Sequence, residues 1–258
     1  MTLTDAGRYL QRNSATVSRF ESAEYPIRRP DVLALLDLYG ISEGRQREAL
    51  LALGEDVWKK GWWDGYAEHI AGSLIDLTWL EARAEEIRSF DGLVLPGLLQ
   101  TREYAEATIR AVDPTAPVDQ TERWVEFRMK RQQVLAAEQP PHLAAVLDEA
   151  LLHRPVGGPE TMRAQLAHLA DLAGRPGIEI RVLPYSVGAH ASHDGSFRLI
   201  TLSEPRAEVV HVDTPAGALY VESDGVDRFT QTYDRLYRET LSPEQSAELL
   251  STTADNAY

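Results

Sequence analysis

The stretch that decides the fold runs from Thr2 to Leu53 and reads TLTDAGRYLQRNSATVSRFESAEYPIRRPDVLALLDLYGISEGRQREALLAL. Apolar residues recur at helical spacing between Leu3 and Leu10. Thr2 precedes them, with Asp5 three residues later, which is the pattern of a helix N-cap reinforced by an acidic partner. The sequence therefore predicts a short helix at the very start of this stretch.

A second short helix is predicted after a polar turn, with Val17 and Phe20 on its inner face. Two short helices joined by a tight turn follow the helix-turn-helix plan. The outer face of the second helix then needs compact hydrogen-bonding side chains that reach base edges in the major groove. The residues predicted to contact bases in this way are Asn13, Ser14, Ala15, Thr16, Ser18 and Arg19. Those predicted to contact phosphates are Thr2, Arg8, Arg28 and Arg29.

Two more helices complete the first predicted domain. An amphipathic helix is expected from Asp31 to Gly40, where the glycine closes it, and a further helix from Ser42 to Leu53. These boundaries predict an all-α DNA-binding domain over residues 1–54, followed by an aromatic linker over residues 55–72 that contains Trp62 and Trp63.

The string SATVSRFESAEYPIRRPDVLALLDLYGI resembles the Xre-type (Cro/repressor-like) helix-turn-helix of actinobacterial transcriptional regulators. The resemblance implies sequence-specific DNA binding. It also exposes a departure, because domains of this type carry a further helix before the one that starts near Thr2, and Met1 leaves no room for it. Three explanations stay open: a start site further upstream, coverage of the gap by the second domain or a partner subunit, or a degenerate DNA-binding unit.

Length and composition limit the number of domains and exclude several classes of protein. At 258 residues the chain fits one large or two modest domains, and its 43% hydrophobic and 26% charged content is ordinary for a globular protein. The chain has no cysteine, which excludes disulfides and thiolate metal sites. No apolar run approaches the roughly 20 residues of a membrane span, and the start does not resemble a signal peptide. A cytoplasmic protein without a membrane partner is expected.

The net charge of -14 is unusual for a DNA-binding protein, but it is unevenly spread. Residues 1–53 hold seven Arg and seven acidic residues, so the rest of the chain carries the whole excess. Phosphate neutralisation supplies much of the affinity for DNA. A homodimer, which presents two such domains, would add two weak contacts through effective concentration.

The remainder, residues 73–258, is predicted to be a larger α+β domain with a small, mostly antiparallel sheet. Residues 73–90 are expected to form one helix, with Glu81 facing water, and residues 117–137 a long helix whose Arg128 and Arg131 point outward. Period-two alternation and apolar runs then predict strands, separated by a helix over residues 160–173 and followed by two closing helices. The predicted strands are residues 142–147, 178–183, 197–202, 209–212 and 218–221.

This second region also resembles a known protein domain. The strings LPGLLQTREYAEATIRA and GRPGIEIRVLPYSVGAHASHDGSFRLITL are similar to the domain of unknown function that follows the Xre helix-turn-helix in many streptomycete regulators. The resemblance implies a role in development or secondary metabolism, with a small acidic protein as partner. It implies no ligand and no reaction.

The densest polar cluster of the second region lies between two predicted strands, from Tyr185 to Ser196. Its His-x-x-His-Asp spacing is loosely metal-like, but no second ligand group is recognisable, so no metal or cofactor is predicted. A polar loop that shapes a pocket or a dimer contact explains the pattern with fewer assumptions. The candidate ligand-binding residues are Trp62, Trp63, Tyr185, His190, His193, Asp194, Arg198 and Glu222.

The leading hypothesis is a dimeric transcriptional regulator that binds double-stranded DNA and responds to a small-molecule effector or a partner protein. The alternative is a repurposed pocket protein or biosynthetic enzyme with a degenerate helix-turn-helix and chemistry near His190, His193 and Asp194. A third hypothesis is an interaction module whose acidic second domain binds a basic partner. No nucleophile elbow, phosphate loop or dinucleotide fingerprint occurs, so the sequence assigns no catalytic residue.

Overall fold

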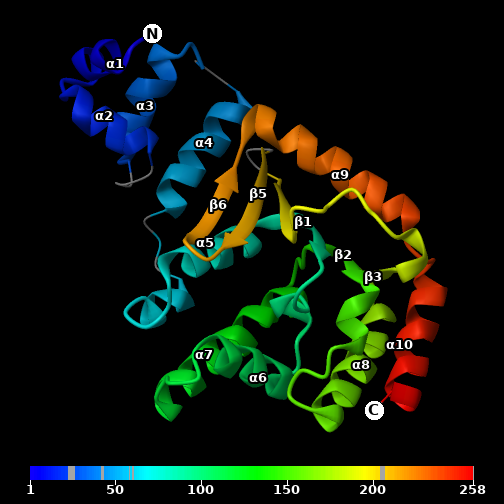
Figure 1. Ribbon diagram of the computed structural model, residues 1–258. Coiled ribbons are helices and arrows are strands. Elements are labelled where there is room, and N and C mark those ends of the chain that lie inside the picture. The colour runs from blue at the N-terminus through cyan, green and yellow to red at the C-terminus, as the bar shows by residue number, and fades with distance from the viewer. Residues whose placement is uncertain (23–26, 42–43, 58, 60, 204–206, 258) are drawn as a thin grey trace. The chain divides into compact units, whose positions relative to one another are not determined.

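The computed structural model of the 258-residue chain describes residues 1–22, 27–41, 44–57, 59, 61–203 and 207–257. The chain divides into two compact units. The first unit comprises residues 1–62 and 203–207, and the second comprises residues 63–202 and 208–258. Each unit is described by itself below, with the element labels of Figure 1.

Helices make up the regular structure of the first unit. They are α1 (Leu3–Leu10), α2 (Ser14–Glu21), α3 (Arg29–Leu38) and α4 (Arg45–Asp56). The predicted helical pair and the helix that follows it are confirmed. The predicted start of the fourth helix at Ser42 lies outside the described residues, and the helix is observed from Arg45.

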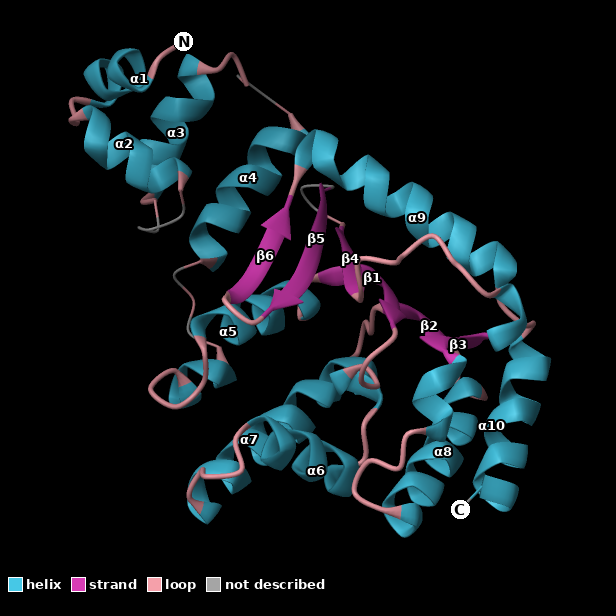
Figure 2. Ribbon diagram, viewed as in Figure 1, coloured by secondary structure: helices cyan, strands magenta, loops and turns pink. Residues whose placement is uncertain are grey.

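The second unit combines a sheet with helices, as the predicted α+β class requires (Figure 2). Its helices are α5 (Gly72–Glu81), α6 (Arg102–Val112), α7 (Val118–Arg131), α8 (Pro159–Ala173), α9 (Val226–Glu239) and α10 (Pro243–Ala257). Its strands are β1 (Ala84–Asp91), β2 (His142–Asp148), β3 (Ile178–Leu183), β4 (Phe197–Leu202), β5 (Ala207–Thr214) and β6 (Gly217–Val221). Short 3-10 helices lie at Trp62–Tyr66, Gly97–Leu99, Gln132–Ala136, Glu149–His153, Tyr185–Val187 and Ser223–Gly225.

The sheet is larger than predicted, and it is mixed. Its six strands lie in the order β3-β2-β1-β4-β5-β6. β1 pairs in parallel with β2, and β2 with β3, whereas β1 and β4 run antiparallel, as do β5 and β6. The predicted sheet was too small because the prediction missed β1, the strand that joins the parallel half to the antiparallel half.

Residues 73–90 form a helix and then a strand, not one helix. α5 ends at Glu81, and β1 follows with the sequence AEEIRSFD. Its many charged residues favoured a helix with a solvated face. In the structure β1 is a central strand hydrogen-bonded on both sides, so pairing with β2 and β4 overrides the local helical preference.

The sheet is covered on both faces, which explains the continuous apolar run of β2. Leu143, Ala145 and Leu147 pack on one face with residues of α6, α8 and α10. Val146 packs on the opposite face with Tyr233 and Leu236 of α9. Figure 1 shows α9 along one side of the sheet and α6, α7 and α8 on the other.

Toward β4, the face of the sheet on which Leu143 lies packs against α5 in place of α6, α8 and α10. Ile200 and Leu202 of β4 pack there with Leu77 and Leu80 of α5. Ser89 and Asp91 alternate with the apolar Phe90, so their side chains project to the same side of the sheet as Ile87. A group of polar residues is thereby placed inside the second unit, beside its apolar core.

Candidate functional site

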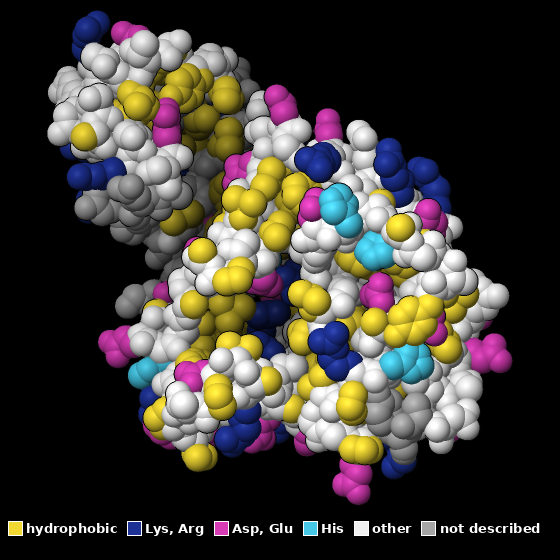
Figure 3. Space-filling view, viewed as in Figure 1, with side chains coloured by type: hydrophobic (Ala, Val, Ile, Leu, Met, Phe, Trp, Pro, Cys, Tyr) yellow, Lys and Arg dark blue, Asp and Glu magenta, His cyan; other side chains and the backbone are white. Residues whose placement is uncertain are grey.

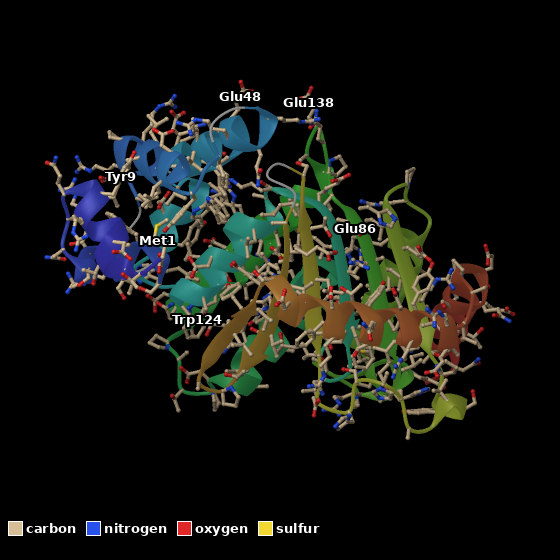
Figure 4. All side chains as sticks on the ribbon, turned by 90° about the horizontal axis from the view of Figure 1, so that it is seen from above. Met1, Tyr9, Glu48, Glu86, Trp124 and Glu138 are labelled. Atoms are coloured by element: carbon tan, nitrogen blue, oxygen red, sulfur yellow. The ribbon has the colours of Figure 1, made fainter. Side chains whose placement is uncertain are left out.

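The first two helices meet through a close backbone approach. A Cβ atom on Gly7 would lie 2.8 Å from the carbonyl oxygen of Arg12, so only a glycine fits at this crossing of α1 and the turn. Gln11 closes α1 in the left-handed region, with φ 53°. The Arg12 guanidinium and the Asp31 carboxylate, 3.4 Å apart, connect this turn to α3. Met1 and Tyr9 mark the position of α1 in Figure 4.

The second helix presents two faces of opposite character. Val17 is fully buried in the first unit. Ser14, Ala15, Ser18 and Arg19 are exposed on the other side of the same helix. Small side chains at three of these positions let the helix backbone come close to a groove floor, and Arg19 adds length and charge. This surface, called here the α2 outer face, consists of Ser14, Ala15, Ser18 and Arg19.

Asn13 and Thr16, also predicted to contact bases, are engaged with each other. The Asn13 Oδ1 atom accepts hydrogen bonds from the Thr16 backbone N–H at 2.7 Å and from its hydroxyl at 2.8 Å. Asn13 is therefore the N-cap of α2, which satisfies one of the free donors at the start of the helix.

The residues predicted to contact phosphates differ in their surroundings. Thr2 forms a capping box with Asp5, in which the Thr2 hydroxyl lies 2.7 Å from Asp5 Oδ2. Arg8 lies exposed in the last turn of α1. Arg28 is the N-cap residue of α3, and the neighbouring Arg29 forms an ion pair with Glu55 of α4. Arg29 must leave this carboxylate before it can contact a phosphate.

In the second unit, the segment from Tyr185 to Ser196, called here the histidine loop, does not gather its polar side chains at one point. The His193 and Asp194 side chains lie 3.1 Å apart, but they are 80% and 76% exposed. The nearest carboxylate to His190 is instead Asp148, with Nε2 3.8 Å from Oδ2. Tyr185 lies outside this pair and stacks on His153 at a ring distance of 5.8 Å. Among the described residues no group of three potential metal ligands converges.

Three further predicted residues lie apart from this loop. Trp62 is the last residue of the first unit's long segment and Trp63 the first residue of the second unit, and both side chains are half-buried. Glu222 is exposed after the end of β6. The sequence offered no spatial link among these three positions.

Arg198, by contrast, belongs to a polar network on one face of the sheet. Its guanidinium lies 3.0 Å from Asp213 Oδ2 and 3.8 Å from Asp91 Oδ1. Ser89 donates its hydroxyl hydrogen to Asp91 at 2.7 Å, and His211 Nδ1 lies 3.2 Å from Arg198 Nη1. Burial, together with the charge of Arg198, lowers the pKa of His211 to about 4, so the ring is neutral at pH 7.

A buried ion pair lies close to this network. Glu81, at the end of α5, is 1% exposed and Arg131, at the end of α7, is 5% exposed, with Nε and Oε2 2.9 Å apart. The contact is not aligned for a hydrogen bond, and no described residue donates one to either Glu81 oxygen. Burial raises the pKa of Glu81 and of Asp91, and it lowers that of Arg131. A Cβ atom on Gly97 would lie 2.7 Å from Arg131 Nη2, so this glycine makes room for the guanidinium.

The predictions that Glu81 and Arg131 face water were wrong. The reason is tertiary: both residues end helices inside the second unit, where they are buried against each other and their opposite charges neutralise each other. The sequence showed a cluster of basic residues near the end of α7, which helical spacing explains as a solvated face. It contained nothing that linked Arg131 to Glu81, fifty positions away.

The segment between β1 and α6 is fixed by glutamine side chains. Gln100 donates to the Leu95 carbonyl at 2.7 Å, and Gln165 donates to the Leu99 carbonyl at 2.8 Å. Gln132 donates to the carbonyls of Gly97 and Gln100. These bonds satisfy backbone groups that would otherwise be buried without partners. The segment therefore forms a rigid floor between α6, α7 and α8.

A cavity of about 580 Å³ opens beside this floor. Its lining comes from the residues before and within α5, the segment after β1, the helices α6 and α7, and the chain after residue 153. Apolar side chains contribute most of its walls. Its lining residues include Leu74, Leu93, Val94, Ile109, Val112, Asp113, Trp124, Arg128 and Arg154. Figure 3 shows a hollow in the second unit with Lys and Arg atoms in its depth and hydrophobic side chains around it.

Trp124, labelled in Figure 4, is held as a fixed wall of this cavity. Its indole N–H donates to the His69 carbonyl at 2.8 Å, and Gln120 donates to the same oxygen at 3.2 Å. None of the predicted ligand-binding residues lines the cavity. Sequence reasoning missed it because the lining residues are scattered over more than eighty positions.

Comparisons with known proteins follow the division into two units. Residues 74–252 match the family described as "Domain of unknown function (DUF5753)", and residues 1–50 match the family described as "Helix-turn-helix domain". No curated protein and no solved structure matches the chain. Among the described residues, none of the helices is both long and apolar enough to cross a membrane.

Proposed function

The chain belongs to the DUF5753 family and carries a helix-turn-helix domain at residues 1–50, and we propose that it is a sequence-specific DNA-binding transcriptional regulator. The α2 outer face is the observation that carries this proposal. It offers small polar side chains and Arg19 on the side opposite the fully buried Val17. Such a helix can enter the major groove without losing its own packing.

In this proposal the α2 outer face reads base edges, while arginines around it fix the register on the phosphates. Arg8 lies exposed in α1, and Arg28 and Arg29 lie at the start of α3. Arg29 exchanges its ion pair with Glu55 for a contact with a phosphate. Salt screens both the ion pair that is broken and the phosphate contact that forms. Asn13 supports the interface from the N-cap by holding the first turn of α2 in place.

The proposal extends to a homodimer. Helix-turn-helix proteins bind two half-sites about 34 Å apart as two-fold dimers. A chain with a net charge of -14 gains most from this arrangement, because two weakly basic domains act at once. Sedimentation of the full chain checks it: a monomer at all concentrations would contradict the dimer.

We further propose that the second unit senses an effector or a small acidic partner protein. The sequence resemblance to streptomycete regulators supports an actinobacterial Xre-type regulator of development or secondary metabolism. Such a protein acts on double-stranded DNA in the cytoplasm. The cavity of the second unit supports the small molecule as the first effector to test, because it is the right size for one.

The test is binding of the full 258-residue chain to DNA from its own promoter region over a salt series. We expect saturable binding that weakens linearly on a log–log plot, with a slope that counts phosphate contacts. Random DNA of the same length is the control. Equal affinity for both DNAs, or no binding at low salt by folded protein, would contradict the proposal.

A further inference from the structure

The cavity of the second unit has an apolar body and an apolar mouth. Ile109 of α6 is buried in its wall, and Trp124 of α7 forms a further side. At the mouth, Leu93, Val94 and Val112 are 66%, 40% and 88% exposed. Exposed apolar side chains that ring one opening favour an apolar occupant over water.

One charged group reaches this apolar space from α7. Arg128 lines the cavity, and its Nη1 atom donates to Gln100 Oε1 at 2.9 Å and to Thr108 Oγ1 at 3.2 Å. Both acceptors are neutral. In the part of the chain that the structure describes, no carboxylate lies within 4.0 Å of this guanidinium. Arg128 is therefore held in a fixed orientation by groups that do not balance its charge.

The surroundings of Arg128 make its uncompensated positive charge still less favourable. Burial, and then the charges of Arg131 and Arg198, lower its pKa to about 10. Arg131 is neutralised by Glu81, and Arg198 by Asp91 and Asp213. Both neighbouring arginines thus have carboxylates as partners, whereas Arg128 faces the cavity without one among the residues that the structure describes.

A second arginine lies on the lining of the same cavity. Arg154 is exposed, and the structure gives its side chain no ion pair with any described carboxylate. The acidic residue of the lining is Asp113, whose Oδ1 atom accepts from the Thr115 backbone N–H at 3.1 Å and from its hydroxyl at 2.8 Å. Asp113 keeps its negative charge, but the lining holds two arginines, Arg128 and Arg154, against this one carboxylate, so the cavity lining favours a negative ligand group.

We propose that this cavity binds an elongated apolar molecule that carries a single carboxylate, with the apolar body along Ile109 and Trp124 and the carboxylate at Arg128. Arg154 attracts the same charge from the surface. The carboxylate would meet a guanidinium already oriented by Gln100 and Thr108, which reduces the entropy lost on binding. The inference rests on the proposed function only in naming this molecule as the effector.

The apolar walls argue against a polyanionic ligand. A nucleotide or a sugar phosphate would bury several hydroxyl and phosphate groups against Leu74, Val94 and Ile109, which offer them no hydrogen bonds. A neutral apolar molecule would fill the same space but leave Arg128 without a counter-charge. The acidic group is therefore the feature to test.

The experiment is calorimetric titration of the full chain, without DNA, with decanoate, decan-1-ol and decylammonium as probes. We expect saturable binding of decanoate, binding of decan-1-ol at least tenfold weaker, and no detectable binding of decylammonium. Equal affinities for decanoate and decan-1-ol would overturn the inference, and so would the absence of saturable binding by decanoate.

Variants locate the site. Arg154→Glu reverses an exposed charge on the lining and should weaken decanoate about tenfold while leaving decan-1-ol unchanged. Arg163→Glu is the matched control, because Arg163 is an exposed arginine of α8 outside the cavity lining. Arg128→Met should reduce decanoate to the affinity of decan-1-ol. Equal effects of Arg154→Glu and Arg163→Glu would place the probe elsewhere and overturn the inference.

The two proposals fail separately. Binding to promoter DNA with no preference for decanoate would refute the cavity assignment alone. Specific binding of decanoate by a chain that does not bind its promoter DNA would refute the proposed regulatory function alone.

Discussion

The two units of this protein handle polar side chains in opposite ways. In the first unit, the capping contacts join residues three positions apart, Thr2 with Asp5 and Asn13 with Thr16, and even the ion pairs between helices, such as Arg29 with Glu55, keep their side chains partly exposed. In the second unit, charged groups far apart in sequence meet inside the fold, as Glu81 and Arg131 do. A surface contact is replaced by water at little cost, whereas a buried charge depends on its partner. The second unit should therefore be far more sensitive to single polar substitutions.

The largest effect is expected at the buried ion pair. Glu81→Gln leaves the Arg131 guanidinium buried without a counter-charge and should lower the free energy of unfolding by about 3 to 5 kcal/mol. Urea unfolding of the full chain measures this, with Arg163→Gln as a surface control.

Replacing both partners tests the same explanation. The double variant Glu81→Leu with Arg131→Met removes both charges, and it should recover most of the loss. A Glu81→Gln loss below about 1 kcal/mol, or a double variant as unstable as the single one, would contradict the importance of the pair.

The next effect depends on pH and concerns His211. Its pKa in the folded chain is about 4, below the ordinary value of 6.5, so the unfolded chain binds the proton more tightly between these values. This contribution to stability is present above pH 6.5 and is lost as the pH falls from about 6.5 to about 4. Its size is about 3 kcal/mol, from a shift of the His211 pKa from 6.5 to about 4.

The comparison that isolates it is wild type against His211→Gln, unfolded in urea at several pH values. The raised pKa values of Glu81 and Asp91 act in the opposite direction, because carboxyls that hold their protons more tightly when folded lose stability as the pH rises. Both contributions are common to the two proteins. We expect the difference in the free energy of unfolding between wild type and His211→Gln to grow with pH between 4 and 6.5. His193→Gln, at an exposed position, is the control. A constant difference would rule out His211 as its source.

In the first unit the expected effect falls on binding, not on stability. Arg19→Ala removes the longest side chain of the α2 outer face and should weaken promoter binding by about 1 to 3 kcal/mol if Arg19 reads a base. Arg163→Ala provides the control in the second unit. Unchanged affinity for the true operator would remove Arg19 from the interface.

The smallest effect is expected at the cap of α2. Asn13→Ala removes the acceptor for the Thr16 N–H and should lower the stability of the first unit by about 1 kcal/mol. Asn13→Ser keeps a capping oxygen and should restore stability. Thermal unfolding followed by circular dichroism compares the three proteins. A serine variant as unstable as the alanine variant would show that the cap is not the cause.

The candidate sites differ in how far the sequence could predict them. The α2 outer face follows from helical periodicity, since Val17 marks the inward side and Ser14, Ser18 and Arg19 then point away. The same reasoning placed Arg131 in water, because periodicity cannot say what packs against a helix. The sequence predicts Arg198 as a candidate ligand-binding residue, whereas in the structure its contacts run to Asp91 and Asp213.

By itself, the sequence determined the helices of the first unit, most of the strands, and the α+β class of the second unit. These features depend on local spacing, caps and alternation, which act within a few residues. The tertiary structure alone decided that residues 84–91 form a central strand, that Glu81 and Arg131 are buried together, and that Arg128 faces an apolar cavity. Each of these depends on contacts between distant segments, whose free energy outweighs local preference only once the sheet and its helices have assembled.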